Sequence, residues 1–77
     1  MSVDDLLMYM EDTSQPLDER MKVLVQAQGL NFQQKAYLGE ALLEIITDEE
    51  RKSVLEGKII QLGAKVKEWR ARALNHN

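Results

Sequence analysis

Nonpolar residues in the C-terminal third of the chain recur at alternating spacings of four and three. The series consists of Leu55, Ile59, Leu62, Val66, Trp69 and Ala73. This is a heptad pattern, and β-branched residues at its a positions with leucine at its d positions favour two-stranded helical packing. The pattern therefore predicts one long helix over residues 48–74 with a continuous nonpolar seam.

The preceding part of the chain predicts three shorter helices. Ser2 is a capping residue for the first helix, and Pro16 opens the second, where a missing N–H group is harmless. Asn31 caps the third helix, which we expect to be the central one because its nonpolar stripe is too wide for a surface helix. Gly39 within this helix indicates a kink, a break, a close helix crossing or a tolerated glycine.

These elements predict an all-α fold, a small bundle of about four helices. A chain of 77 residues has room for a single domain. Residues 1–47 form a three-helix head, residues 48–74 form the long amphipathic helix with coiled-coil character, and residues 75–77 form a frayed tail. Thr47 and Glu50 have the spacing of a capping box and begin the long helix.

The predicted long helix extends beyond its neighbours. At 1.5 Å per residue it spans roughly 40 Å, against roughly 23 Å for the third helix. An overhang of roughly 17 Å, which contains Val66 and Trp69, then lacks cover from its own chain. Burying such side chains is worth on the order of 25 cal/mol per Å² of nonpolar surface. We therefore expect the seam to be an oligomer or partner interface, with a dimer favoured over a larger protein partner and over a compact monomer.

Charge is distributed unevenly along the chain. Residues 1–50 carry eleven acidic and three basic residues, whereas residues 51–77 carry two acidic and seven basic residues. Five cations of the predicted long helix are possible contacts for an acidic partner or for phosphate: Lys58, Lys65, Lys67, Arg70 and Arg72. The interpretation that we favour makes them solvated flanks of the seam, and an acidic protein surface is the next choice.

The composition contains few residues that could perform chemistry. The chain has no cysteine, and its one histidine, His76, lies at the predicted frayed end. We therefore expect no disulfide, no metal site and no catalytic nucleophile with its base. No glycine-rich phosphate loop is present, so we expect neither a cofactor nor an enzyme.

The hydrophobic pattern also predicts where the protein is found. No nonpolar run approaches the roughly 18 residues of a membrane-spanning helix. The N-terminal residues lack the basic segment that begins a signal peptide. We therefore expect a soluble, cytoplasmic protein that does not bind membranes.

One segment resembles a DNA-binding motif. Residues 28–39, QGLNFQQKAYLG, resemble the first two helices of a repressor-type helix-turn-helix, with a Gly-Leu-polar turn and a later Leu-Gly pair. The resemblance implies contact with duplex DNA. That family continues with a turn and a basic recognition helix, whereas residues 40–46 of this chain are acidic and nonpolar.

These observations favour a small non-enzymatic protein–protein interaction module: a regulator, an inhibitor or an assembly adaptor. It would act as a helical homodimer, paired either parallel or antiparallel, or by docking its C-terminal helix on a partner protein. The alternative is a DNA-binding transcriptional regulator that uses residues 28–39 or the basic C-terminal helix.

Overall fold

The computed structural model describes residues 2–57 and 62–75, and every element of regular secondary structure in them is an α-helix. The helices are α1 (Val3–Met10), α2 (Leu17–Gln26), α3 (Phe32–Ile45), α4 (Asp48–Leu55) and α5 (Leu62–Asn75). The predicted all-α class is therefore confirmed. The predicted number of helices and the predicted long C-terminal helix are not.

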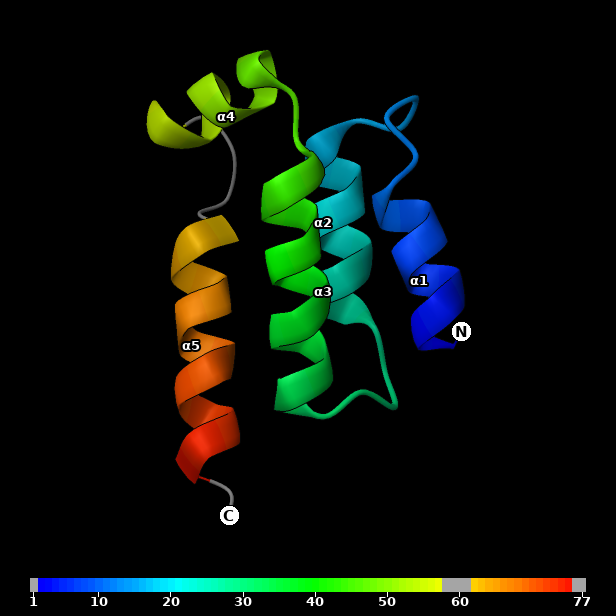
Figure 1. Cartoon of the computed structure of the whole chain (residues 1–77), viewed down its shortest axis with the longest axis vertical. Coiled ribbons are helices and arrows are strands. Elements are labelled where there is room, and N and C mark those ends of the chain that lie inside the picture. The colour runs from blue at the N-terminus through cyan, green and yellow to red at the C-terminus, as the bar shows by residue number, and fades with distance from the viewer. Residues whose placement is uncertain (1, 58–61, 76–77) are drawn as a thin grey trace.

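Helix α3 lies at the centre of the molecule (Figure 1). It has α1 and α2 on one side and α5 on the other, while α4 crosses one end of the bundle. The molecule measures 37 × 25 × 18 Å along its principal axes. The prediction that the third helix is the central element is confirmed, because α3 packs against α1, α2 and α5.

The predicted capping residues begin three of the helices. The Ser2 hydroxyl accepts a hydrogen bond from the Asp5 backbone N–H at 3.1 Å. Asn31 forms a complete capping box with Gln34, and Thr47 forms one with Glu50. These contacts satisfy backbone N–H groups that have no partner inside the helix, which is why local sequence determines where these helices begin.

The core is continuous from the first helix to the last. Its buried nonpolar members are Leu6, Met10, Leu17, Met21, Leu24, Ala36, Leu38, Leu42, Ile46, Leu62, Val66 and Trp69. The nonpolar core therefore joins α5 to the N-terminal helices through α3, and α4 contributes no buried residue to it.

The prediction of one helix over residues 48–74 is wrong, because helix α4 ends at Leu55. Glu56 is the C-cap of α4, and Gly57 follows with a φ of +73°. Such a left-handed residue cannot continue a right-handed helix, and glycine commonly occupies this position after a helix end. The C-terminal helix α5 has 14 residues, the same number as α3, so the predicted overhang does not exist.

Of the residues predicted to form a frayed tail, 75–77, only Asn75 lies within the described residues. Asn75 is the last residue of α5. His76 and Asn77 lie outside the described residues. Ile59 and Lys58, which the sequence places in the seam and among the basic contacts, also lie outside them.

Candidate functional site

A close helix crossing joins α5 to α3 at Gly39. An ideal Cβ atom on Gly39 would lie 2.5 Å from Val66 Cγ2 and 3.1 Å from Trp69 Cζ3. Because glycine has no side chain, the backbone of α3 can approach α5 this closely. Of the readings that the sequence allowed for Gly39, the close crossing is the one observed, and α3 continues through it without a break.

The crossing covers most of the described seam within a single chain. Leu62, Val66 and Trp69 are only 0%, 3% and 4% exposed. Ala73 is half-buried, whereas Leu55 on α4 is 81% exposed. The expectation that the seam lacks cover from its own chain is therefore wrong for Leu62, Val66 and Trp69, because α3 covers them.

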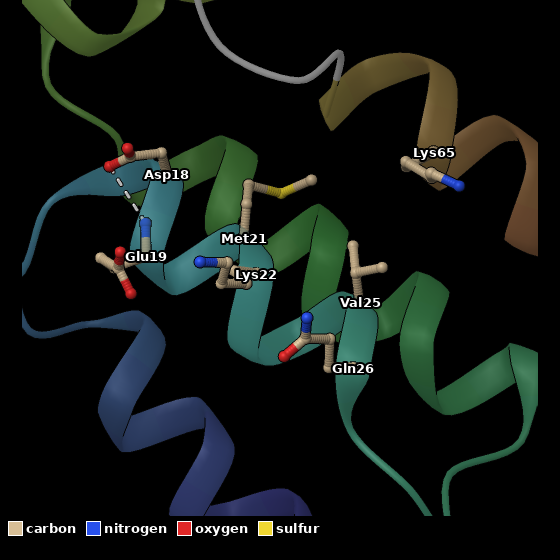
Figure 2. A pocket seen from close by; sticks show the side chains of 7 residues that line it. All are labelled: Asp18, Glu19, Met21, Lys22, Val25, Gln26 and Lys65. Atoms are coloured by element: carbon tan, nitrogen blue, oxygen red, sulfur yellow. Dashed lines mark hydrogen bonds between the residues drawn. The ribbon is translucent and has the colours of Figure 1, made fainter.

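A groove lies beside this crossing, between α2 and α5. It encloses about 340 Å³ and is lined mainly by α2, with Lys65 as its contribution from α5. Figure 2 shows Met21 and Val25 projecting from α2 on the side that faces Lys65. Met21 is only 1% exposed and belongs to the core, whereas Val25 is half-buried. Val25 is therefore the nonpolar side chain that the groove offers to a partner.

Charged side chains lie along the edges of the groove. Asp18 and Glu19 belong to the first turn of α2, and Lys22 lies one turn further along the same helix. On α5, the Lys65 ammonium lies 3.5 Å from a Glu68 carboxylate oxygen. The groove therefore offers a nonpolar floor with a mixed, mostly solvated charged rim.

A buried ion pair connects α2 to the start of α4. The Arg20 side chain is fully buried, and its Nη2 pairs with Glu50 Oε2. Its Nη1 donates a hydrogen bond to the Met10 carbonyl oxygen at 2.8 Å. Arg20 Nε is buried and has no hydrogen-bond partner among the described residues. One guanidinium thus ties together the end of α1, the body of α2 and the beginning of α4.

The electrostatics of Glu50 follow from this arrangement. Burial by itself raises the pKa of Glu50, but the hydrogen bond from the Thr47 backbone N–H and the positive charge of Arg20 outweigh it. The net effect holds the pKa of Glu50 below its ordinary value of 4.5. Glu50 is therefore an anion at neutral pH, and it serves both as helix cap and as counter-ion.

Arg20 is a functional residue that the sequence-based predictions do not include, although the sequence carries a signal for it. Leu17, Arg20, Met21 and Leu24 follow one another at spacings of three, one and three. Residues with that spacing share one helix face. A basic residue within a buried stripe requires a counter-ion, because an unpaired buried charge is very costly. That rule predicts a buried partner for Arg20, but it does not identify Glu50.

The predicted basic contacts of α5 are largely engaged within the chain. Arg70 pairs with Glu40 of α3, and Arg72 lies 3.3 Å from a Glu68 carboxylate oxygen. The Arg72 guanidinium also lies over the Phe32 ring, 5.2 Å from its centroid. Lys67 is exposed. Of these contacts, the Arg70–Glu40 pair and the Arg72–Phe32 contact join α5 to α3, whereas the Arg72–Glu68 pair lies within α5.

The helix-turn-helix resemblance fits only the first part of the motif. Residues 27–31 connect α2 to α3, as two helices of such a motif would be connected. Helix α3 then continues past Gly39 to Ile45, so no turn follows the Leu-Gly pair. Leu42, in the segment where a recognition helix would lie, is fully buried.

A few large nonpolar side chains are exposed on the surface. Besides Leu55 they are Met8, Tyr37 and Leu74. They lie on α4, α1, α3 and α5 respectively, and so do not share one helix. The groove between α2 and α5 is therefore the better candidate for a binding site, because its nonpolar atoms lie together and are recessed.

The described residues contain no group of three His, Asp or Glu side chains placed to hold a metal ion. Within the same residues, no helix combines the length and nonpolar character needed to cross a membrane. Comparisons with protein-family models, with curated proteins and with solved structures find no match.

Proposed function

We propose that this chain is a non-enzymatic protein–protein interaction module: a regulator, an inhibitor or an assembly adaptor. The groove between α2 and α5 is its docking site for a partner protein. Self-association as a homodimer is a second mode of interaction. The observation that carries the proposal is the recess between α2 and α5, into which the half-buried Val25 projects beside the buried Met21.

The shape of the groove favours a helical partner segment. Two helices that flank a nonpolar depression can accept the nonpolar face of an amphipathic helix, which is a common mode of peptide recognition. The stems of Lys22 and Lys65 extend the nonpolar surface, while their ammonium groups remain in water. A partner helix with leucine or isoleucine on one face and acidic residues beside it would match this surface.

Capture of partners from the native host tests the proposal. Val25→Glu places a carboxylate in the groove, and Tyr37→Glu places one at an exposed position of α3 outside the groove. Tagged wild-type protein and both variants are used as bait, and bound proteins are identified by mass spectrometry. We expect Val25→Glu to lose a protein that wild type and Tyr37→Glu both retain. Equal capture by all three, with both variants folded by circular dichroism, would refute groove docking.

DNA binding is the alternative function, and it has less support. The guanidinium groups of Arg70 and Arg72 already have acidic partners, Glu40 and Glu68. Phosphate binding would have to displace these carboxylates. Binding to duplex DNA depends steeply on salt, so retention on a heparin column at low salt would favour the alternative. We expect the protein to elute without retention.

The proposed location is the cytoplasm. The chain has no cysteine, and its stability therefore does not depend on an oxidising compartment. A fluorescent fusion expressed in the host should distribute through the cytoplasm.

A further inference from the structure

We propose that the segment of the partner protein that binds between α2 and α5 is an amphipathic helix with charges of both signs beside its nonpolar face. It carries an acidic residue and, one helical turn away, a basic residue. The inference rests on the proposed function and names the chemistry of the partner more closely. Groove docking remains testable without it, because Val25 is uncharged and its replacement reports on docking whatever charges the partner has.

The rim that α2 contributes to the groove carries both signs of charge in a fixed order. Asp18 and Glu19 lie in the first turn of α2, and Lys22 follows three to four residues later. That separation along a helix is roughly 5–6 Å. Figure 2 shows the two acidic residues at one end of the groove, Val25 and Gln26 toward the other end, and Lys22 between them. A helix that lies beside α2 therefore meets negative charge first and positive charge one turn further along.

The three charges of this rim are available to a partner. Asp18, Glu19 and Lys22 are exposed, and none of them forms an ion pair with another residue in the ranges 2–57 and 62–75. The Asp18 carboxylate accepts only the Glu19 backbone N–H, at 3.1 Å. Arg70 and Arg72 of α5, by contrast, already have acidic partners within the chain. Binding at the α2 rim therefore breaks no existing ion pair.

The opposite rim of the groove is less selective. Lys65 is its contribution from α5, and the Lys65 ammonium lies 3.5 Å from a Glu68 carboxylate oxygen. A carboxylate of the partner at Lys65 would have to compete with Glu68. The α2 rim therefore determines which charges the partner needs.

A helix with a single sign of charge fits the α2 rim poorly. A wholly acidic helix would pair with Lys22 but would also meet Asp18 and Glu19, and a wholly basic helix would have the reverse fault. Like charges at contact distance destabilise about as much as opposite charges stabilise. A helix with an acidic residue beside Lys22 and a basic residue beside the two acidic ones makes favourable pairs alone. An acidic and a basic residue one turn apart also stabilise the partner helix itself.

Nonpolar contact and charge have different roles in this binding. The half-buried Val25 provides the nonpolar contact that any amphipathic helix can use. Exposed ion pairs change affinity by only a few-fold each, and complementary charge acts mainly on specificity. We therefore expect charge to select among helices that share the same nonpolar face.

Three synthetic peptides test the proposal. Each is an amphipathic helix of about 16 residues, long enough to form a helix in isolation, with the same leucine face. On each flank the first peptide carries Glu and Lys one turn apart, the second carries two Glu, and the third carries two Lys. Fluorescence anisotropy of the labelled peptides measures their Kd for the full-length protein. We expect the Glu–Lys peptide to bind about three- to tenfold more tightly than the other two at low salt, and the difference to shrink at high salt.

A charge reversal of the rim should change which peptide is preferred. Asp18→Lys combined with Glu19→Lys makes the α2 rim wholly positive, so the Glu–Glu peptide should then bind most tightly. Asp4→Lys combined with Asp5→Lys is the matched control, because it makes the same change of charge in the first turn of another helix, α1. The control should keep the wild-type order of affinities.

A milder variant keeps the test decisive if the reversed rim destabilises α2. Asp18→Asn combined with Glu19→Gln removes the negative charges with little change of shape. The preference for the Glu–Lys peptide over the Glu–Glu peptide should then disappear. Val25→Glu should weaken the binding of all three peptides.

The possible results separate this proposal from groove docking itself. Equal binding of the three peptides, weakened by Val25→Glu, would overturn the mixed-charge partner and leave groove docking in place. Binding that Val25→Glu does not affect, or no binding of any peptide, would overturn the proposal as well. Wild-type protein that associates with itself, and loses this association when Asp18 and Glu19 are reversed, would identify a second copy as the occupant and contradict the proposal.

Discussion

The backbone of Gly39 lies against the ring of Trp69, so closely that a Cβ atom on Gly39 would be 3.1 Å from Trp69 Cζ3. This contact brings α5 onto α3 and buries the side chains that the sequence suggests are available to a partner. It also makes the stability of the fold sensitive to a single methyl group. Replacing either of two helical glycines, Gly39 or Gly63, with alanine should therefore change the free energy of unfolding in opposite directions.

Gly39→Ala should lower the free energy of unfolding by about 1–3 kcal/mol, because the added methyl group overpacks the crossing with Val66. Gly63→Ala should raise it by up to about 1 kcal/mol, because that glycine faces open space within a helix. Urea unfolding followed by the fluorescence of Trp69, the only tryptophan, measures both. Stabilisation by Gly39→Ala would contradict the observed crossing.

A double variant tests whether the Val66 side chain sets how closely α5 can approach α3 at Gly39. Val66→Ala removes Cγ2, the atom 2.5 Å from the Cβ position of Gly39. Gly39→Ala combined with Val66→Ala should therefore cost less than the sum of the single changes, by about 0.5–3 kcal/mol. Strict additivity in urea unfolding would mean that the two residues do not meet as described.

Val66→Glu should destabilise the isolated chain whether or not it self-associates. The substitution places a carboxylate where only 3% of the side chain is exposed, and an unpaired buried charge is very costly. Lys67→Glu, at the exposed neighbouring position, should change stability by less than about 0.5 kcal/mol. Circular dichroism and thermal melting compare the two. A folded Val66→Glu monomer as stable as wild type would show that α5 does not pack as described.

Replacing Glu50 should destabilise the protein more than replacing Arg20, its partner in the ion pair. Glu50→Gln leaves the fully buried Arg20 without its counter-ion and should cost roughly 3–5 kcal/mol. Arg20→Met leaves Glu50, whose side chain is 20% exposed and can be hydrated, and should cost less. Denaturant unfolding of both variants at neutral pH measures the difference. A larger loss from Arg20→Met would contradict this order.

The same pair predicts a response to acid. The pKa of Glu50 is lower in the folded protein than its ordinary value of 4.5, so the unfolded state binds the proton more readily. The resulting stability is fully present above about pH 4.5 and is lost as the pH falls through the folded pKa. Unfolding free energies of wild type and Glu50→Gln, measured from neutral pH downward, should converge in acid. A constant difference would exclude Glu50 as the titrating group.

Local signals in the sequence predict much of this fold. Ser2, Asn31 and Thr47 identify helix starts because a capping contact involves residues only three apart in the chain. The wide nonpolar stripe of the third helix identifies the centre of the bundle, since a helix covered on several sides needs nonpolar residues on several sides.

Long-range relationships could not be predicted in the same way. A heptad stripe reports that one face of a helix is buried, but it does not say what covers it, and here α3 covers Leu62, Val66 and Trp69. The end of α4 before Gly57 has a local signal, because glycine commonly follows a helix end, but the heptad pattern continues across it and favours a single helix. The pairing of Arg20 with Glu50 joins residues 30 apart for the same reason.

The central claim is that partner proteins bind in the groove between α2 and α5. The most direct measurement replaces Val25, on the floor of the groove, with a photo-reactive phenylalanine analogue in the native host. Tyr37, outside the groove, is replaced in the same way as the control. Irradiation followed by mass spectrometry should give a specific adduct between a host protein and the probe at Val25, and no such adduct at Tyr37. No adduct at Val25, or the same adduct from both positions, would contradict the claim.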